Sequence, residues 1–368
     1  MKPVYIVSWL FALAISFVSC DDWLDKTPKD RLYPDVYFKT EDELRLFTNQ
    51  FYNNLVPSAV DIYSESSDLI VKSDLMLEMS GQRIIPDEGN GWNFTALRDS
   101  NFYRQYSHNC TEVNARNRYD GVARFFRAYF YFVKVRRYGD VPWYDKALDS
   151  DDPELYKARD SREFVMQKML EDLYFAIANL PKTKNAYVLT RWTALALKSR
   201  VCLFEGTFRK YHGLEDCEKY LNACVSASET FMNESGYTLY KSGSTPYRDL
   251  FASINLQADE VIFGRDYEAS LSVLHNVQNY ENSTTMGRPG MNKKIVNSYL
   301  MADGSRFTDK AGYETMTFDQ ECQNRDPRLA QTIRTPGYTR IGSTKKEAPN
   351  LAYTMTGYHL IKYSMTAN

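Results

Sequence analysis

Between Arg83 and Asn101 the sequence gathers the kinds of side chain that bind a sugar ring. Trp92 offers a flat apolar face, and hydrogen-bonding residues surround it in the chain: Arg83, Asn93, Arg98 and Asn101. A pyranose presents apolar C–H faces and a rim of hydroxyls, so an aromatic ring beside such groups is the chemistry it needs. Glycines in the same stretch indicate an irregular loop, which is the type of segment that often serves recognition.

Each of these candidates also has a structural interpretation. A large aromatic side chain is buried on average, so Trp92 suits a core position that steadies its loop equally well. For Arg98 the alternative is an ion pair within the fold. Tyr267 and Tyr280 are further candidates, for an opposite wall of the site, but most of the 28 tyrosines in this chain are expected to be structural.

Motifs for catalysis are absent from the sequence. It contains no H-E-x-x-H, G-x-S-x-G or G-x-x-x-x-G-K, and its four histidines are too scattered to suggest a metal cluster. One acidic group lacks the glycine of an EF-hand and is interpreted as a solvated loop, with calcium binding as the alternative: Asp149, Asp151, Asp152 and Glu154. We therefore expect no enzyme, no cofactor and no metal. A glycosidase needs two carboxylates at a set separation, and the 47 acidic residues offer too many pairs for the sequence to exclude one.

Composition excludes several classes of protein. The chain has 368 residues, enough for two or three domains or one large one, and its 43% hydrophobic and 25% charged residues exclude global disorder. Lys and Arg number 45 against 47 Asp and Glu, a net charge of -2. Because a nucleic-acid-binding protein would show a basic excess, we expect no nucleic-acid partner.

Residues 1–19 are predicted to be a lipoprotein signal peptide. Lys2 precedes an apolar stretch over 4–18 that is too short for a confident membrane span. The segment Phe17-Val18-Ser19-Cys20 resembles a bacterial lipobox, in which the cysteine is lipidated and begins the mature chain. The alternative is an ordinary signal peptide with an incidental cysteine. The other five cysteines are an odd number and do not suggest a disulfide framework.

Apolar residues at helical spacing predict a helix over 41–55 and another over 118–138. The inward faces are expected to be Leu44, Phe47, Phe51 and Leu55 in the first, and Val122, Phe126, Tyr129, Phe130 and Val133 in the second. The second helix should end near Tyr138, because Gly139 and Pro142 follow.

Three further helices are predicted after residue 159. Asp160 is the expected N-cap of one that ends before Pro181, with Glu163 at the capping-box position. Thr190 is the expected N-cap of the next, with Gly206 near its end, and the last covers 215–233. Their expected core residues are Val165, Met169, Leu173, Ile177 and Leu180, then Trp192, Leu195, Ala196, Ser199 and Leu203, then Leu221, Cys224, Val225 and Phe231.

These helices predict a mainly α fold. The pairs 118–138 with 160–180 and 191–206 with 215–233 are arranged as in degenerate tetratricopeptide units, which stack helix pairs around a shared core. That core is expected to contain Phe126, Tyr129, Phe130 and Trp192. Residues 56–117 and 234–368 are expected to be loop-rich, with a few short strands such as 260–263. A basic run on the first paired helix is interpreted as a solvated or ion-paired face, with a phosphate or partner contact as the alternative: Arg124, Arg127, Lys134, Arg136 and Arg137.

Residues 124–142, RFFRAYFYFVKVRRYGDVP, resemble the signature helix of the SusD/RagB family of nutrient-binding outer-membrane lipoproteins. Asp21-Asp22 resembles the surface-export signal of such lipoproteins in Bacteroidetes. Other segments resemble further family blocks in order: 22–25 with Pro28, 159–161, 172–173 running to 180–181, 259–263, 297–299 with 303–304, 325–329, and 356–358 with 362–363. Family members continue well past the last of these blocks, so this chain resembles one that lacks the closing C-terminal helices.

The resemblance implies a single SusD-like domain over 20–368, with its helical scaffold centred on 118–233. It implies a protein anchored through Cys20 on the outside of the outer membrane, as a lid over a SusC-like TonB-dependent transporter to which it passes an oligosaccharide. Family sugar contacts cluster in the neighbourhood of Trp92 and Asn93. Two alternatives stay open: a surface hydrolase on a helical scaffold, and a helical-repeat scaffold that contacts only protein partners.

Overall fold

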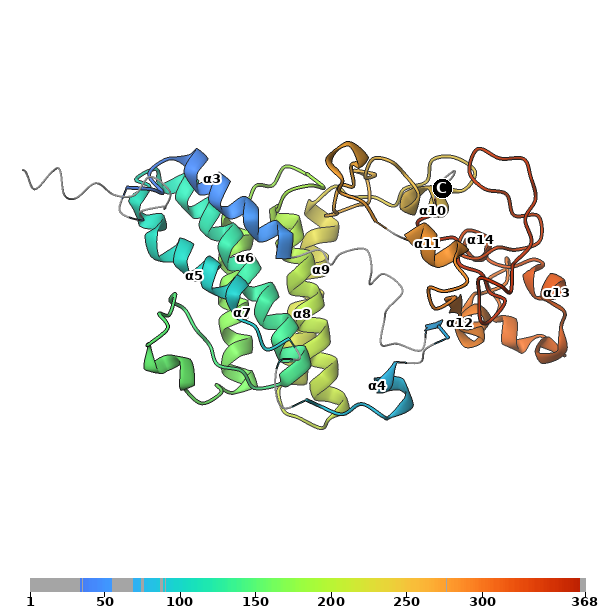
Figure 1. Cartoon of the computed structure of the whole chain (residues 1–368), viewed down its shortest axis with the longest axis horizontal. Helices are drawn as coiled ribbons and strands as arrows, with labels where there is room; N and C mark the ends of the chain where they lie inside the picture. Colours follow the sequence, from blue (N-terminus) through green and yellow to red (C-terminus); the bar gives the residue numbers. More distant parts are fainter. Residues whose placement is uncertain are drawn as a thin grey trace, which may run out of the picture.

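The computed structural model describes residues 34, 36–54, 69–73, 76–86, 89, 91–275 and 277–364. The predicted signal peptide, Cys20 and Leu55 lie outside them. Within the described residues, no helix combines the length and the apolar character needed to cross a bilayer. Figure 1 shows an elongated molecule with long parallel helices at one end and short helices joined by loops at the other.

The helical end is built around four long helices: α6 (Val113–Tyr138), α7 (Arg162–Asn179), α8 (Arg191–Tyr211) and α9 (Cys217–Glu234). α6 packs on α7, α8 packs on α9, and α7 joins the two pairs, which confirms the predicted pairing. The short helices α3 (Glu41–Asn49) and α5 (Thr95–Tyr106) cover another side of α6. The 3-10 turns η1 (Gln50–Asn54), η3 (Ser107–Asn109) and η4 (Pro153–Tyr156) complete this end, referred to below as the helical half.

The described residues after α9 form a loop-rich half. Its helices are short: α10 (Pro246–Phe251), α11 (Val277–Asn282), α12 (Lys293–Ser298), α13 (Phe318–Cys322) and α14 (Pro327–Ala330). Three 3-10 turns lie among them, η5 (Ala269–Leu271), η6 (Phe307–Asp309) and η7 (Tyr313–Thr315). Residues 260–263 form turns and bends, so the strand predicted there is wrong.

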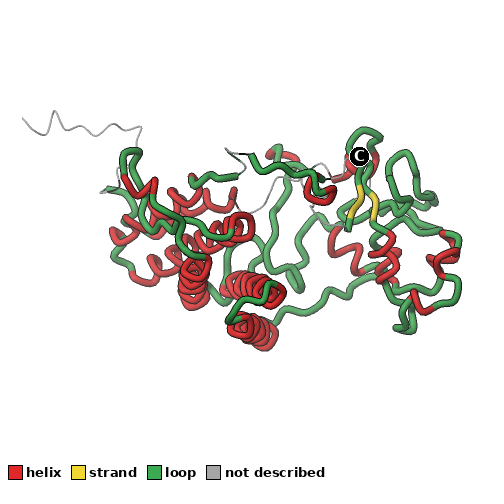
Figure 2. The backbone as a smooth tube through the Cα atoms, turned by 90° about the horizontal axis from the view of Figure 1, so that it is seen from below, coloured by secondary structure: helices red, strands yellow, loops and turns green. Residues whose placement is uncertain are grey.

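One small antiparallel sheet joins distant parts of the sequence. Strand β1 (Ile70–Val71) pairs with β2 (Gly290–Met291), with Ile70 opposite Met291. Figure 2 shows the two strands within the loop-rich half, near the C-terminal end of the chain. The short helix α4 (Leu77–Ser80) follows β1. The segment that leads to α5 therefore starts in one half of the molecule and ends in the other.

The helix boundaries follow their capping residues. Thr40 begins α3 and Thr190 begins α8 through capping boxes, and α6 ends at Tyr138, before Gly139 with its positive φ of 73°. The N-cap of α7 is Ser161 rather than the predicted Asp160. The Asp160 carboxylate instead accepts a hydrogen bond from the Trp143 backbone N–H at 2.7 Å, so it holds the preceding loop.

Two other details of the predicted helices are wrong. Glu163 does not complete a capping box, because with Ser161 as the N-cap the capping-box position is Phe164. The Glu163 carboxylate pairs with Lys219 and accepts a hydrogen bond from the Tyr220 hydroxyl on α9. Gly206 does not lie at the end of its helix, since α8 continues to Tyr211. A Cβ at Gly206 would lie 2.7 Å from Leu221 Cδ2, so the glycine lets α9 approach α8 closely.

The main core lies around α6 and α7. Of the residues predicted to form it, Phe126 is buried, Tyr129 and Phe130 are partly buried, and Trp192 is buried in a separate cluster with Leu195 and Ala227. Three residues predicted to face inward are exposed: Val133 at 40%, Leu203 at 51% and Val225 at 53%. For α6 the physical reason is that α7 covers one side and α3 with α5 another. The helix therefore buries a wider set than one stripe: Phe125, Tyr131, Phe132 and Val135.

The basic run on α6 is ion-paired in its middle and exposed at Arg136 and Arg137, which agrees with the predicted solvated or ion-paired face. Arg127 is 4% exposed and donates two hydrogen bonds to Asp172 on α7, from Nε at 2.6 Å and from Nη2 at 2.7 Å. Arg124 lies 3.6 Å from the same carboxylate. Removing one partner of such a buried pair strands a charge in the core, so the pair fixes how α6 meets α7. Lys134 is also buried, with the Gly91 carbonyl as its hydrogen-bond acceptor.

Candidate functional site

A cavity of about 250 Å³ opens between the first turns of α5 and the loop that follows α6. α5 contributes one wall and the loop contributes the other, and the lining residues are Phe94, Thr95, Leu97, Arg98, Asn101, Tyr144, Lys146, Leu148 and Leu155. The lining is mainly apolar with a few polar side chains, which is the usual composition of a small-molecule site.

Three aromatic rings lead from the surface to this cavity. Trp92 meets Phe94 edge to face with ring centroids 5.2 Å apart, and Phe94 meets Tyr144 in the same way at 5.8 Å. Phe94 and Tyr144 both line the cavity. Trp92 remains 38% exposed. An aromatic surface of this kind, continuous with a cavity, can contact the C–H faces of successive sugar rings.

Asn93 explains why α5 begins where it does. Its side-chain oxygen accepts a hydrogen bond from the Thr95 backbone N–H at 2.8 Å, which satisfies a donor in the first turn of the helix. The Trp92 backbone N–H donates to the Gly89 carbonyl at 3.0 Å, and Gly89 has a positive φ of 72°. The chain therefore turns tightly just before the Trp92 ring and enters the helix just after it.

Arg98 and Asn101 lie on the face of α5 that lines the cavity. Arg98 donates from Nε to the Leu148 carbonyl at 3.3 Å, and its guanidinium lies 3.9 Å from Asp149, yet its side chain stays 54% exposed. Asn101 is 1% exposed, and its amide donates to the carbonyls of Tyr144 at 2.9 Å and Lys146 at 3.2 Å. Asn101 thus holds the opposite wall in place, whereas Arg98 reaches the rim.

The other three predicted site residues have different surroundings. Arg83 lies 3.5 Å from Glu78 of α4. Tyr267 packs edge to face against His275 at 4.9 Å, and Tyr280 in α11 packs against the core of the loop-rich half. None of these three lines the cavity among the described residues. Of the predicted site residues, Arg98 and Asn101 line the cavity, and Trp92 and Asn93 lie in the turn that leads into the same helix. Arg83, Tyr267 and Tyr280 do not line it.

Sequence analysis did not identify several residues of the site. Phe94 follows Trp92 by two positions and could have been found as a second aromatic residue in the same loop. Tyr144 and Lys146 lie about fifty positions further along the chain, and no local pattern connects them to α5. Arg159 places its guanidinium 5.0 Å from the centre of the Trp92 ring, a cation–π contact from a third segment.

The charges at the rim of the cavity are compensated. Lys146 pairs with Asp152 at 3.3 Å and with Glu154 at 2.9 Å, and these hydrogen bonds raise its pKa. Burial raises the pKa of the Tyr144 hydroxyl, which stays neutral and protonated at physiological pH. Among the described residues, no group of three His, Cys, Asp or Glu side chains is placed to hold a metal ion.

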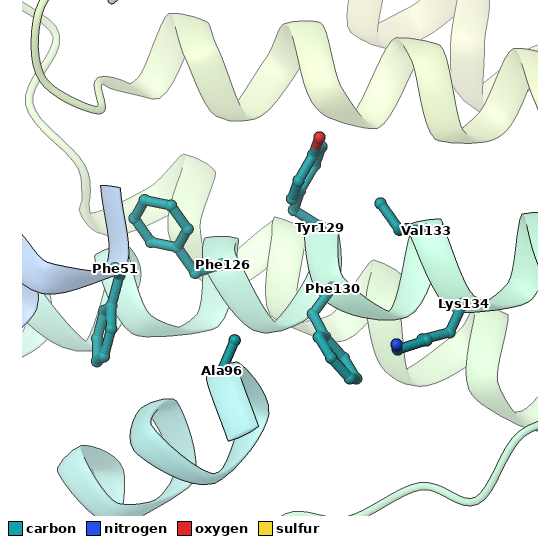
Figure 3. A pocket seen from close by; sticks show the side chains of 7 residues that line it. All are labelled: Phe51, Ala96, Phe126, Tyr129, Phe130, Val133 and Lys134. Carbon is teal, nitrogen blue, oxygen red and sulfur yellow. The ribbon is translucent and has the colours of Figure 1, made fainter. Parts of the chain in front are cut away.

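The described residues form other cavities. One of about 120 Å³ lies beside α6 and is lined by Phe51, Ala96, Phe126, Tyr129, Phe130, Val133 and Lys134. Figure 3 shows Phe130 and Lys134 pointing from α6 toward α5, with Tyr129 and Val133 on the opposite side. Another cavity, of about 410 Å³, lies in the loop-rich half beside Phe318 and Tyr358.

Comparison with known proteins identifies the family. Residues 22–203 match the family model described as starch-binding associating with outer membrane, and residues 250–368 match the SusD family model. A SusD-like protein of Formosa agariphila is 25% identical over 294 residues, which are 74% of this chain and 55% of the relative. A second, from the same organism, is 20% identical over 73% of this chain and 52% of its own length. The chain thus spans about half the length of these curated relatives.

Two solved structures share the fold. A SusD-like protein from Bacteroides fragilis superposes with a TM-score of 0.73 at 20% identity, over 93% of this chain and 72% of the other. A SusD-like carbohydrate binding protein from the same species gives a TM-score of 0.68 at 17% identity, over 88% of this chain and 68% of the other. Together with the family models, these likenesses establish that the chain belongs to the SusD/RagB family.

Proposed function

We propose that this protein binds an oligosaccharide, without cleaving it, at the cavity that Phe94 and Tyr144 line and at the neighbouring ring of Trp92. The observation that carries the proposal is the row of three rings continuous with an apolar cavity of about 250 Å³. Hydroxyls at the edge of a sugar would meet Asn93 and Arg98, while its C–H faces meet the rings. The description of one matching family model as starch-binding supports the same ligand class.

Compensated rim charges favour a neutral glycan over an acidic one. Lys146 already pairs with two carboxylates, and Arg98 already donates to the Leu148 carbonyl. A uronic acid would have to displace Asp152 or Glu154 from Lys146, which gains little free energy for an exposed pair. A neutral hexose needs no such exchange.

A hydrolase on the same scaffold is the weaker candidate. The described residues that line the cavity include no carboxylate, whereas hydrolysis of a glycosidic bond typically uses two. A scaffold that contacts only proteins would not require aromatic rings beside a cavity. Binding and release suit a protein that captures a glycan and passes it on, and we propose a SusC-like TonB-dependent transporter as the recipient.

The experiment that tests this function is a glycan panel. Purified protein is titrated calorimetrically with neutral and uronic-acid oligosaccharides, and the reducing ends are measured after incubation. Saturable binding of a neutral oligosaccharide with no new reducing ends is the expected result. New reducing ends would favour the hydrolase. The absence of binding to every member of the panel would contradict the proposal and favour the protein scaffold.

We also propose that Cys20 carries a lipid that holds the protein at the outer membrane, facing the exterior. The lipobox-like sequence at residues 17–20 and the outer-membrane description of the matching family model support this location. Because acyl chains contribute about 0.8 kcal/mol per buried methylene, several chains anchor a protein stably. Cys20→Ala is expected to release the protein from membranes in a fractionation assay. A variant still bound to membranes and accessible to protease on intact cells would contradict the anchor.

A further inference from the structure

Lys134 occupies an unusual position for a lysine. Its side chain lies near the C-terminal end of α6 and is only 7% exposed. The ammonium group donates a hydrogen bond to the Gly91 carbonyl, and it lies 4.9 Å from the centre of the Phe130 ring and 5.4 Å from that of Phe94. Burying an ammonium is costly unless such partners replace water. The hydrogen bond to the Gly91 carbonyl therefore compensates for part of the cost of burying the Lys134 ammonium group.

Tyr138 lies one helical turn after Lys134. Residues four apart share a face of a helix, so the two side chains reach the same loop. The Tyr138 ring meets Trp92 edge to face with centroids 4.8 Å apart and planes at 87°. α6 therefore contacts two consecutive residues of the loop, the backbone of Gly91 through Lys134 and the ring of Trp92 through Tyr138.

The glycine at 91 allows this approach. Its φ is 84°, a conformation that side-chain-bearing residues rarely adopt. A Cβ at this position would lie 3.4 Å from the Tyr138 hydroxyl oxygen, so the positive φ, rather than the space, is what favours glycine here. Arg159 contacts one face of the Trp92 ring from another segment, with its guanidinium 5.0 Å from the ring centre.

We propose that Lys134 and Tyr138 are positioning residues that hold Trp92 ready for the glycan. The ring is then fixed before binding, so the glycan does not have to order it and affinity is higher. This inference rests on the proposed function, because it takes Trp92 as a glycan contact. The proposal also gives a role to the C-terminal end of α6. No described residue of this helix lines the cavity, but Lys134 and Tyr138 contact Gly91 and Trp92 beside it.

The test compares matched variants in the full protein. Lys134→Met keeps the length of the side chain and removes the donor, whereas Lys134→Arg keeps a cation. Tyr138→Ala removes the ring, whereas Tyr138→Phe keeps it. Lys210→Met, at an exposed position in α8, is the control. Acrylamide quenching of Trp92 fluorescence is obtained for each variant as the difference from the same variant carrying Trp92→Phe, and maltoheptaose binding is measured by calorimetry.

Lys134→Met and Tyr138→Ala are expected to increase the quenching of Trp92 and to raise the Kd for maltoheptaose about 3- to 10-fold, the cost of ordering one side chain. The two conservative variants and Lys210→Met should resemble the parent, with unchanged helical circular dichroism throughout. Unchanged Trp92 quenching in Lys134→Met and Tyr138→Ala would overturn the positioning role. If quenching rises while Trp92→Ala leaves glycan affinity unchanged, Trp92 is positioned but is not a glycan contact, and it is the proposed function that fails.

Discussion

The two halves of the molecule differ in how they satisfy their backbone hydrogen bonds and in the size of their apolar cores. In the helical half, long helices satisfy their own backbone hydrogen bonds, and a large apolar cluster around α6 and α7 holds them together. The loop-rich half has a much smaller apolar cluster, and its helices are four to six residues long. Many of its backbone carbonyls lie outside regular structure, and some of them accept hydrogen bonds from buried polar side chains.

Arg325 is an example of a buried side chain that donates to backbone carbonyls in the loop-rich half. It is buried, and its guanidinium donates to the carbonyls of Glu321 at 2.8 Å, Val296 at 2.6 Å and Tyr299 at 2.9 Å. Arg127 in the helical half uses the same type of side chain to pair with a carboxylate. The difference teaches that an irregular backbone needs specific donors at specific points, whereas a helix bundle needs apolar volume. The two halves should therefore respond to different kinds of substitution.

The largest effect is expected from removing apolar volume in the helical half. Phe126 is 6% exposed and packs against Phe51 and Tyr52. Phe126→Ala should lower the free energy of unfolding by about 3–5 kcal/mol, as for other buried phenylalanines. Chemical denaturation followed at 222 nm measures it. Val133→Ala, at an exposed position of the same helix, is the control, and equal effects of the two would show that the wrong face has been assigned to the core.

Arg325→Met should test the loop-rich half. The variant keeps apolar bulk but leaves three carbonyls without their donor, at a cost of about 2–4 kcal/mol. Hydrogen exchange should rise in residues 290–364 and stay unchanged in α6 to α9. Arg328→Met, at a side chain that is 59% exposed, is the matched control. An equal loss of hydrogen-exchange protection in both halves would mean that they unfold as one unit, and would contradict the proposed difference between them.

Acid should affect the loop-rich half first. His359 is fully buried, its Nε2 lies 2.8 Å from the Glu281 carbonyl, and burial together with Arg334 lowers its pKa to about 4. In the unfolded chain His359 has its ordinary pKa of about 6.5, so it takes up a proton at a higher pH there than in the folded protein. The stability that comes from keeping His359 neutral is therefore complete above about pH 6.5 and is lost as the pH falls toward 4.

The expected loss is about 2–3 kcal/mol between pH 6.5 and 4. Arg340 and Glu347 lie near the same imidazole and also influence it. Denaturation midpoints across this range measure the effect, and His359→Gln should flatten the profile. A profile of equal slope in the variant would assign the acid sensitivity to other groups.

The smallest effect in this series concerns binding rather than folding. Trp92→Ala should weaken glycan binding by about 1–3 kcal/mol, the scale of one lost aromatic contact, and leave both halves folded. Calorimetry and circular dichroism are read together, because an unfolded variant would also lose binding. If affinity is unchanged, Trp92 only supports its loop, and Tyr267 and Tyr280 become the next residues to substitute.

Local signals in the sequence predicted much of the helical half. Gly139 marks the end of α6 and Thr190 the start of α8, because each acts on its own neighbours in the chain. Burial was less predictable, since it depends on what covers a helix. Val133 lies on the expected stripe but stays 40% exposed, while Lys134 beside it is buried against the loop that precedes α5, through the Gly91 carbonyl and the Phe94 ring.

The candidate site was predictable where it is local. Trp92, Asn93 and Arg98 come together because they are close in sequence and lead into one helix. Tyr144 and Lys146 were missed because the whole of α6 separates them in the sequence from α5, beside which the loop after α6 lies. The loop-rich half offers no periodicity, so the surroundings of Tyr267 and Tyr280 depended on long-range contacts that spacing does not encode.

The pairing of β1 with β2 has a consequence for biosynthesis. The two strands are more than 200 positions apart, and all of α5 to α9 lies between them. Because a chain is made from its N-terminus at about 5–20 residues per second, β1 waits for tens of seconds before its partner has been synthesised. During that time the helical half can assemble, but the segment that starts at Ile70 and leads to Trp92 has only one end fixed. Because α6 holds the loop at Gly91 and Trp92, and the described lining residues of the cavity all belong to the helical half, the proposed site can form before the last third of the chain is synthesised.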